Sequence, residues 1–315
     1  MKITAIAPWF GSKRTLAPEI VRQLGKHSYY FEACAGSMAV ILAKEPTEHE
    51  TVCDLHGAMT NLAWCVQREE VAAKLYDRLQ KVLYSDAVYL DSKDWLNERE
   101  AKEPDDKWSG PDTIDPICHE ELNPEFAYHY FVASWMGRNG VAGTARVNYQ
   151  IATRWTKGGG SGPGRFRAAV ESIPAWHDRL RNVHILRRDL FDVLPKIQDD
   201  AAVAIYADPP YLPDTISGNS RYLCEFAPDD HRRLAEALRR FKLARVVVSY
   251  YASPALADLY PDWTVLDCSR HKHLHVQNSR GTNRKEAPEV LLVNGPIAAA
   301  LPEPSLAKRQ KGLFA

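Results

Sequence analysis

A carboxylate, two prolines and an aromatic ring follow one another directly after an apolar run. The run covers residues 201–207 (AAVAIYA), and the four residues behind it are Asp208, Pro209, Pro210 and Tyr211. Such a run predicts a buried strand, and in open α/β sheets ligands bind at the carboxyl ends of the strands. The prolines fix the direction of the chain and donate no backbone hydrogen bonds, so this corner is rich in acceptors. It suits a flat molecule whose amino group is held in plane beside the ring.

Three further carboxylates occupy similar places after predicted strands. Glu32 lies in FEACAGS (residues 31–37), whose small residues would let backbone N–H groups approach a ligand, although a tight turn without a ligand has the same composition. Asp54 ends the run TVCD, and Asp189 follows another short apolar run. An acid after the second strand binds ribose hydroxyls in nucleoside-binding folds, yet either aspartate could instead cap the next helix. Together with Asp208 these carboxylates outline one crevice.

Near the start of the chain, Trp9 and Lys13 bracket the segment WFGSK, just ahead of a helix that Pro18 would help to start. A phosphate-binding loop is one interpretation, but the GxxxxGK[ST] pattern is not met. A capping loop with Trp9 packed in the core is the other structural interpretation. The segment alone does not decide between a binding role and these alternatives.

The pattern of cysteines and histidines predicts no metal site. The cysteines (Cys34, Cys53, Cys65, Cys118, Cys224 and Cys268) contain no CxxC pair, which favours reduced thiols over a disulfide or zinc framework. No histidine lies at ligand spacing beside the four carboxylates. Alternate histidines in RHKHLH (residues 270–275) could bind zinc, but a basic ribbon against phosphate is the favoured interpretation.

The chain balances 40 Lys and Arg residues against 40 Asp and Glu residues over 315 positions. This zero net charge argues neither for nor against nucleic acid, so any basic surface must be local. The length allows a full α/β core with a second, smaller unit. We expect neither a signal peptide nor a membrane span, and therefore a location in the cytoplasm.

Strands alternate with helices in two zones of the chain, which predicts a largely parallel, doubly wound sheet. The expected strands are 27–31, 51–54, 183–186, 203–206, 245–250 and 289–293, and the expected helices are 16–24, 38–44, 60–67, 190–197 and 229–241. The segment between the zones is charged at first, then aromatic, then rich in glycine and arginine. We therefore expect a catalytic domain over 1–82 and 180–298, an inserted domain over 83–179, and a tail over 299–315.

These motifs, in this order, carry a family resemblance. PWFGSK, FEACAGS, CD, an insertion and then ADPPY are similar to the Dam-like (D12, α-group) class of DNA adenine-N6 methyltransferases. The resemblance runs from about residue 7 to residue 294 and includes RVVVSYYASP and GTNRKEAPEVLLVN. It implies a Rossmann-like fold that uses S-adenosylmethionine, with an inserted, mainly helical domain that recognises double-stranded DNA.

The resemblance also implies which residues bind the cofactor. They are Trp9, Lys13, Glu32, Cys34, Gly36, Asp54, Asp189 and Asp208, with Asp189 expected near the adenine of the cofactor. The chain departs from the family at two positions of the first turn. Met38 stands where a second glycine is usual, and Cys34 stands where an aromatic residue is usual. These departures bear on the cofactor contacts of that turn.

The expected chemistry is methyl transfer to N6 of adenine. The catalytic set is Asp208, Pro209, Pro210 and Tyr211. The lone pair of N6 is delocalised into the ring, so acceptance of both N–H bonds by the Asp208 carboxylate and the Pro209 carbonyl would free it to attack the methyl group. The base must leave the helix to reach the site, and Tyr211 could stack on it. Asp in the first position favours adenine, whereas N4-cytosine enzymes typically carry Ser.

The insertion is expected to read the DNA. Candidate contacts are Arg138, Asn139, Asn148, Arg154, Lys157, Arg165 and Arg167. Arg can read guanine and Asn can read adenine in the major groove, and others would bind phosphate. A flexible glycine loop with solvated arginines is the alternative for GGGSGPG.

The expected partner is therefore double-stranded DNA, with no membrane, and the expected state is a monomer, with a dimer on DNA as the alternative. A restriction-modification role in a bacterial or phage-infected cell fits the resemblance. Two other functions stay open: the same fold acting on RNA or another planar amine, and a DNA-binding relative without transfer activity.

Overall fold

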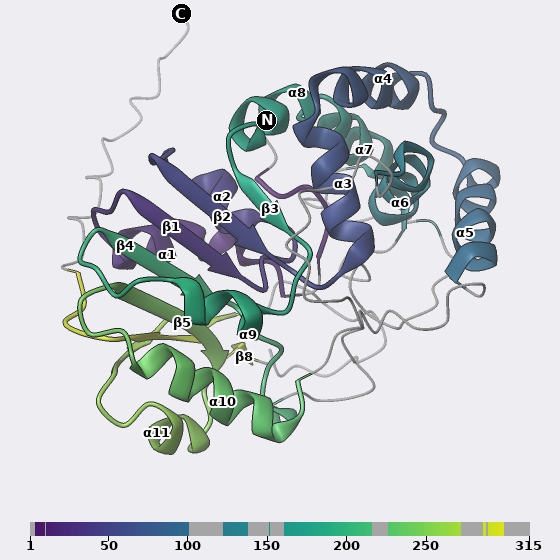
Figure 1. The fold of residues 1–315 in the computed structure, drawn as a ribbon. Helices are drawn as coiled ribbons and strands as arrows, with labels where there is room; N and C mark the ends of the chain where they lie inside the picture. Colours follow the sequence, from purple (N-terminus) through teal and green to yellow (C-terminus); the bar gives the residue numbers. More distant parts are fainter. Residues whose placement is uncertain are drawn as a thin grey trace, which may run out of the picture.

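The computed structural model describes residues 4–9, 11–100, 122–137, 151, 161–215, 226–271, 286–287 and 289–298. Its centre is a seven-stranded sheet in the order β3-β2-β1-β4-β5-β9-β6 (Figure 1). The strands are β1 (Tyr29–Ala33), β2 (His49–Cys53), β3 (His184–Leu186), β4 (Val203–Ala207), β5 (Arg245–Tyr251), β6 (Thr264–Asp267) and β9 (Glu289–Val293). A separate ribbon pairs β7 (Arg270–His271) with β8 (Glu286–Ala287).

Six strands of the sheet run in the same direction, and β9 alone, which lies between β5 and β6, runs opposite to them. The parallel pairs are β3 with β2, β2 with β1, β1 with β4, and β4 with β5, whereas β9 runs antiparallel to both β5 and β6. The strand order reverses between β1 and β4, which is the switch point where ligands bind in such sheets. The prediction of a doubly wound, mostly parallel Rossmann-like sheet is confirmed.

Helices cover both faces of the sheet. They are α1 (Ala17–Leu24), α2 (Ala39–Ala43), α3 (Gly57–Gln67), α4 (Glu69–Gln80), α5 (Asp86–Glu100), α6 (Pro124–Met136), α7 (Gly162–Val170), α8 (Ile173–Leu180), α9 (Leu190–Val193), α10 (Pro228–Arg239) and α11 (Ala255–Leu259). In Figure 1, α9, α10 and α11 lie on one side of the sheet, and α3 to α8 form a helical group beyond β3. Alternate residues of β1 and β4 belong to two separate hydrophobic cores, one on each face.

The expected elements are found, with their ends shifted by one to three residues. The helix expected over 60–67 begins at Gly57, because the side chain of His56 caps it by accepting a hydrogen bond from the backbone of Met59. The helix expected over 190–197 divides into α9 and a 3-10 turn at Leu194–Lys196. The edge strand β6, the helix α11 and the strand β8 were not expected, whereas β7 begins the RHKHLH segment that was predicted as a ribbon.

Hydrogen bonds from side chains of α3 connect the helical group to the sheet. The side chain of Asn61 exchanges hydrogen bonds with the backbone of Asn123, which caps α6. Indole N–H groups add two more links: Trp64 donates to the carbonyl of Ile185, and Trp135 donates to the carbonyl of Ile6. The division into a catalytic domain (1–82 and 180–298) and an inserted domain (83–179) stays a prediction, and the tail (299–315) lies outside the described residues.

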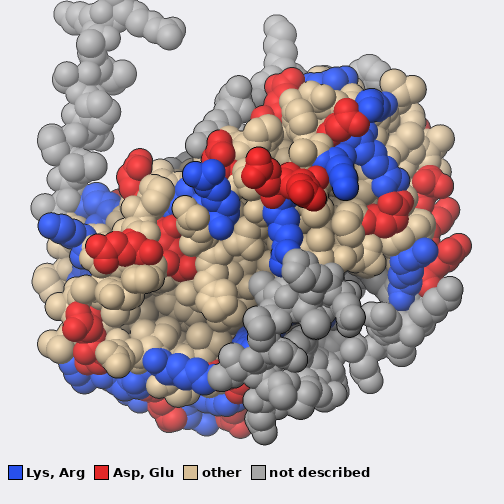
Figure 2. Space-filling view, turned by 45° about the horizontal axis from the view of Figure 1, so that its top comes forward, with Lys and Arg blue, Asp and Glu red and all other residues tan. Residues whose placement is uncertain are grey.

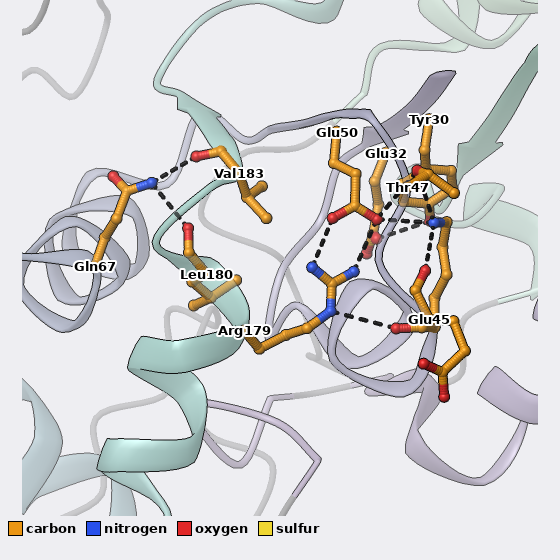
Figure 3. Close-up of polar contacts among 10 residues, drawn as sticks. Tyr30, Glu32, Glu45, Thr47, Glu50, Gln67, Arg179, Leu180 and Val183 are labelled. Carbon is orange, nitrogen blue, oxygen red and sulfur yellow. Dashed lines mark hydrogen bonds and ion pairs between the residues drawn. The ribbon is translucent and has the colours of Figure 1, made fainter. Parts of the chain in front are cut away.

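A buried ion network lies at the amino end of β2 (Figure 3). Arg179 of α8 donates two hydrogen bonds to the Glu50 carboxylate, at 2.6 and 2.8 Å, and Lys44 donates a third at 2.8 Å. The side chains of Lys44 and Glu50 are almost fully buried. We define these three residues as the structural ion cluster, since it joins α8 to α2 and β2.

The first and last described segments meet at the same edge of the sheet. Arg22 donates to the carbonyl of Ala298, and the side-chain oxygen of Gln23 accepts from the backbone of Ala298. Arg245 bridges the carbonyls of Gln23 and Pro296. Helix α1 therefore holds the chain end that follows β9. Across the described ranges, no helix is both long enough and apolar enough to cross a bilayer.

Candidate active site

Three loops leave the carboxyl edge of the sheet side by side. The parallel register places Ala33 of β1 level with Cys53 of β2 and with Ala207 of β4. The residues that follow these strand ends therefore emerge together. The backbone joins the loops, because the Asp208 N–H donates to the carbonyl of Ala33 at 3.2 Å. The switch point of the sheet is thus lined by the segments that the sequence predicts for the site.

The turn after β1 fits closely under Trp9. Gly36 has a φ of +47°, and a Cβ there would lie 2.8 Å from the Trp9 indole nitrogen. Only glycine avoids both the strained backbone and the clash. The Gly36 N–H donates to Asp54 Oδ2 at 2.7 Å, and the Trp9 ring meets His56 edge-on at 5.0 Å. The structure thus brings Trp9, Gly36 and Asp54 together.

Cys34 and Met38, the two positions that depart from the family pattern, have left-handed backbones. Their φ angles are 54° and 59°. A glycine would adopt this conformation without strain, whereas other residues there cost about 1–3 kcal/mol each. The Met38 side chain is fully buried, so hydrophobic packing offsets part of that cost. The turn therefore keeps the glycine-like conformation although its residue types differ.

The sequence allowed Asp54 and Asp189 either to bind a ligand or to cap the following helix, and the structure shows that they differ in this respect. Asp54 does not cap α3: its Oδ1 accepts from the backbone of His56 at 2.8 Å while its Oδ2 binds Gly36. Asp189 does cap α9, by accepting from the backbone of Phe191 at 2.9 Å. Asp54 thus joins the loops after β1 and β2, and Asp189 has a structural role in its own helix.

The ammonium group of Lys13 lies at the centre of the site. Its Nζ is 2.9 Å from Asp208 Oδ1 and 3.2 Å from Glu289 Oε1, and it donates to the carbonyl of Gly11 at 2.8 Å. The residue is only 4% exposed. We define Lys13, Asp208 and Glu289 as the site ion cluster, which holds one cation between two carboxylates.

Asp208 is fixed through one of its oxygens. Oδ1 accepts from Lys13 and also from the Ser249 hydroxyl at 2.7 Å, and the Tyr206 hydroxyl lies 2.9 Å behind Ser249. Among the described residues, no hydrogen bond reaches Oδ2. Burial raises the pKa of Asp208 above its ordinary value; Lys13 and Ser249 oppose this shift, and the charge of Glu289 adds to it. The carboxylate therefore keeps one oxygen available as an acceptor.

Tyr211 is held beside this cluster. Its hydroxyl donates to Glu289 Oε1 at 2.8 Å, and its ring centre lies 4.3 Å from the ring of Tyr251 and 5.0 Å from Lys13 Nζ. The ring is largely buried. The segment Asp208–Tyr211 therefore places its acid and its ring against the same ammonium group.

A small recess opens next to this cluster. It is lined by Trp9, Ser12, Lys13, Glu32, Ala35, Gly36, Ser37, Ala39, Val40, Tyr206 and Asp208. Glu32 is only 1% exposed and accepts from the Tyr30 hydroxyl at 2.8 Å. Burial raises the pKa of Glu32 to about 8. Five of the predicted cofactor residues thus border one recess, while Cys34, Asp54 and Asp189 do not line it.

Most of the predicted DNA contacts cannot be placed. Arg138, Asn139, Asn148, Arg154 and Lys157 lie outside the described residues. Arg165 and Arg167 lie on α7, half-buried and exposed respectively. On the face drawn in Figure 2, Lys and Arg side chains are interspersed with Asp and Glu among the described residues, as the zero net charge suggests.

The sequence interpretation missed two polar residues of this site, Ser249 and Glu289. Both lie in segments that resemble the family, RVVVSYYASP and GTNRKEAPEVLLVN, but neither residue was singled out. The signal available was a polar residue beside an apolar run: Ser249 follows VVV within β5, and Glu289 precedes VLLV at the start of β9. Within the described residues, no group of three or more His, Cys, Asp or Glu side chains could hold a metal ion.

The solved structures that resemble this chain include three distant neighbours. Precorrin 8w decarboxylase from Methanobacterium thermoautotrophicum is 9% identical, covering 89% of this chain and 87% of its own, with a TM-score of 0.31. The rRNA methyltransferase aviRa from Streptomyces viridochromogenes is 13% identical, covering 89% and 83%, with a TM-score of 0.32. SMU.776, described as a methyltransferase complexed with SAH, is 9% identical with a TM-score of 0.34; 91% of this chain aligns with it but spans only 50% of its length. Scores this low carry no argument.

Comparison with protein families is decisive. No curated protein matches the chain. The profile of a family described as D12 class N6 adenine-specific DNA methyltransferase, however, matches residues 9–279. Because this match covers most of the sequence and includes the loops that form the site, the chain belongs to the D12 class of N6 adenine-specific DNA methyltransferases, enzymes that methylate DNA with S-adenosylmethionine as cofactor.

Proposed function

We propose that this enzyme transfers the methyl group of S-adenosylmethionine to N6 of an adenine rotated out of duplex DNA, within a specific sequence. One observation carries the proposal. The Asp208 carboxylate at the end of β4 is anchored through Oδ1 by Lys13 and Ser249, which leaves Oδ2 as an acceptor beside the recess.

The residues around the recess fit this cofactor. When bound, it supplies a methyl group already activated by a positive sulfonium. The site ion cluster has two carboxylates for one ammonium group, so its excess negative charge complements that positive charge. The residues that would hold the cofactor are Trp9, Lys13, Glu32, Cys34, Gly36, Asp54, Asp189 and Asp208. Asp54 would exchange its bond to Gly36 for the ribose hydroxyls.

Asp208 and its neighbours would then position the base. Asp208 Oδ2 and the carbonyl of Pro209 would accept the two N6–H bonds, which would withdraw the lone pair from the ring so that it can attack the methyl carbon. As the new N–C bond forms, the S–C bond of the sulfonium would break, and N6 would release one proton to solvent. Pro209 and Pro210 keep the loop rigid and free of competing donors. Stacking on Tyr211 would contribute about 1–3 kcal/mol toward the cost of removing the base from the duplex. Positioning is thus the main contribution of the protein.

The inserted segment would supply sequence recognition. Arg138, Asn139, Asn148, Arg154, Lys157, Arg165 and Arg167 provide the donors that read guanine and adenine or bind phosphate. The family membership supports DNA as the substrate, and the concentration of these residues between 138 and 167 supports their role in binding it.

The test is methyl transfer from labelled cofactor to unmethylated duplex DNA, followed by methylation-sensitive sequencing to map the site. We expect label in N6-methyladenine at one sequence. Label in RNA or protein, or no label with DNA binding retained, would contradict the proposal. Asp208→Ala should abolish transfer and retain DNA binding. The matched control is Asp258→Ala, which removes an exposed carboxylate on α11 and should leave transfer unchanged.

A further inference from the structure

Glu289 contacts two residues of the proposed machinery with one oxygen. Its Oε1 accepts the Tyr211 hydroxyl at 2.8 Å and lies 3.2 Å from Lys13 Nζ. The carboxylate is about one-fifth exposed, whereas the ammonium group that it faces is only 4% exposed. A hydrogen bond to a charged group in such partly buried surroundings is stronger than one between neutral groups.

The sheet fixes where this carboxylate lies. Glu289 is the first residue of β9 and pairs with Tyr251 at the end of β5 in antiparallel register. The ring of Tyr251 in turn packs against Tyr211 at 4.3 Å. Glu289 therefore reaches the Tyr211 hydroxyl from a rigid strand, while Tyr251 supports the ring from the neighbouring strand.

We propose that Glu289 is a positioning residue for methyl transfer: it fixes the ring of Tyr211 that would receive the target base, and it holds Lys13 against Asp208. This inference rests on the proposed function of the site. Glu289 does not line the recess beside Asp208, so its direct contacts are with Tyr211 and Lys13 and not with a cofactor bound in that recess.

A purely structural ion pair would behave differently. If Glu289 only neutralised Lys13, its removal would change folding stability, and its effect on transfer would be independent of the Tyr211 hydroxyl. If Glu289 acts through Tyr211, removing either partner of their hydrogen bond removes the same contribution. The two effects are then not additive, which a double-mutant cycle measures.

The experiment compares Glu289→Gln, Tyr211→Phe and the double variant at the DNA site mapped for the wild-type enzyme. We expect Glu289→Gln to lower kcat by about 10- to 100-fold, because a neutral amide replaces the charged acceptor of the Tyr211 hydroxyl and no longer neutralises Lys13. Tyr211→Phe should lower kcat by about 3- to 10-fold. The double variant should match Glu289→Gln within about twofold, and the Kd of S-adenosylmethionine should change by less than about threefold in all of them.

The matched control is Asp267→Asn on the neighbouring strand β6, where the carboxylate is exposed and accepts a hydrogen bond from the backbone of Ser269, two residues further on. It should leave kcat unchanged. Multiplying effects in the double variant, or a kcat for Glu289→Gln within threefold of wild type, would overturn the inference. If Glu289→Gln fails to fold by circular dichroism, an unchanged kcat for Tyr211→Phe overturns it. A wild-type enzyme that does not methylate DNA would instead refute the proposed function.

Discussion

Two groups of buried ions lie at opposite edges of the same sheet. The structural ion cluster, Lys44, Glu50 and Arg179, lies at the amino end of β2 (Figure 3), and the site ion cluster lies at the carboxyl end of β4. The first surrounds one carboxylate with two cations. The second surrounds one cation with two carboxylates. The two clusters therefore carry opposite excess charge.

The difference shows in the acidity of the two central carboxyl groups. Burial alone would raise the pKa of Glu50, but the hydrogen bonds and charges of Arg179 and Lys44 outweigh it, so the pKa lies below its ordinary value. Burial raises the pKa of Asp208, and its single cation does not compensate. A carboxylate with a structural role is fully paired. The carboxylate of the site is held through one oxygen, and its other oxygen accepts no hydrogen bond from the described residues.

The largest expected effect is on folding, from Glu50→Gln. This change leaves the two buried cations of the structural ion cluster without their carboxylate, and breaking such a buried pair costs about 3–5 kcal/mol. Chemical denaturation should show this loss in the free energy of unfolding at neutral pH, with kcat of the folded enzyme unchanged. The control is Glu48→Gln, which changes an exposed carboxylate two residues away. A loss below about 1 kcal/mol would mean that the cluster does not hold α8 to the sheet.

The next effect is on transfer, from Lys13→Met. Removing the only cation of the site ion cluster releases Asp208 Oδ1 and leaves two carboxylates close together, which favours protonation of one of them. We expect kcat to fall by about 100-fold, because charge-assisted hydrogen bonds at both carboxylates are lost. The free energy of unfolding should fall less than in Glu50→Gln, since Asp208 and Glu289 keep access to water.

Lys26→Met, at an exposed position after α1, is the control for that change. If Lys13→Met destabilised the fold as strongly as Glu50→Gln while kcat stayed near wild type, the contrast between a structural cluster and a functional one would be lost.

The most gradual effect is a pH dependence of stability, and it concerns Glu32, which lies between the two clusters. Its pKa of about 8 exceeds the ordinary value of 4.5, so the native state keeps a proton that the unfolded chain releases between these values. Stability should therefore decrease as pH rises through this window, by up to about 1.4 kcal/mol per pH unit. Glu32→Gln should remove this decrease. In denaturant unfolding, the free energy of unfolding of the variant should therefore rise relative to that of the wild type from about pH 5 to pH 8. Parallel curves for the two proteins would show that Glu32 is ionised in the fold.

The features of the site that could be predicted from sequence are those that depend on residues close to one another along the chain. The run before Asp208 reads as a central strand, and all five residues of β4 are indeed buried. Small residues around Gly36 indicate a tight turn, and parallel strands necessarily deliver their following loops to one edge. The glycine-like conformation of Met38 was not predictable from its residue type.

Glu289 could not be predicted because its role depends on strand direction. A residue that begins a strand lies at the edge away from the site if the strand is parallel, and at the site if it is antiparallel. The letters EVLLV are the same in both cases. Arg179 was missed for a related reason: its partner Glu50 is 129 positions away, and only the packing of α8 on the sheet brings them together. Asp54 could have capped α3, but it joins two loops instead because its Oδ2 accepts a hydrogen bond from the backbone N–H of Gly36, which lies 18 residues earlier.

The attachment of the chain end that follows β9 to helix α1 has a consequence for when the enzyme becomes active. Lys13 is made among the first residues, but its second carboxylate arrives only with β9, after the rest of the sheet. A ribosome-bound chain that has not yet produced β9 carries the DPPY segment and the glycine turn, yet its tyrosine hydroxyl has no carboxylate to bind. Methyl transfer should therefore require that β9 has been synthesised and has paired with β5 and β6.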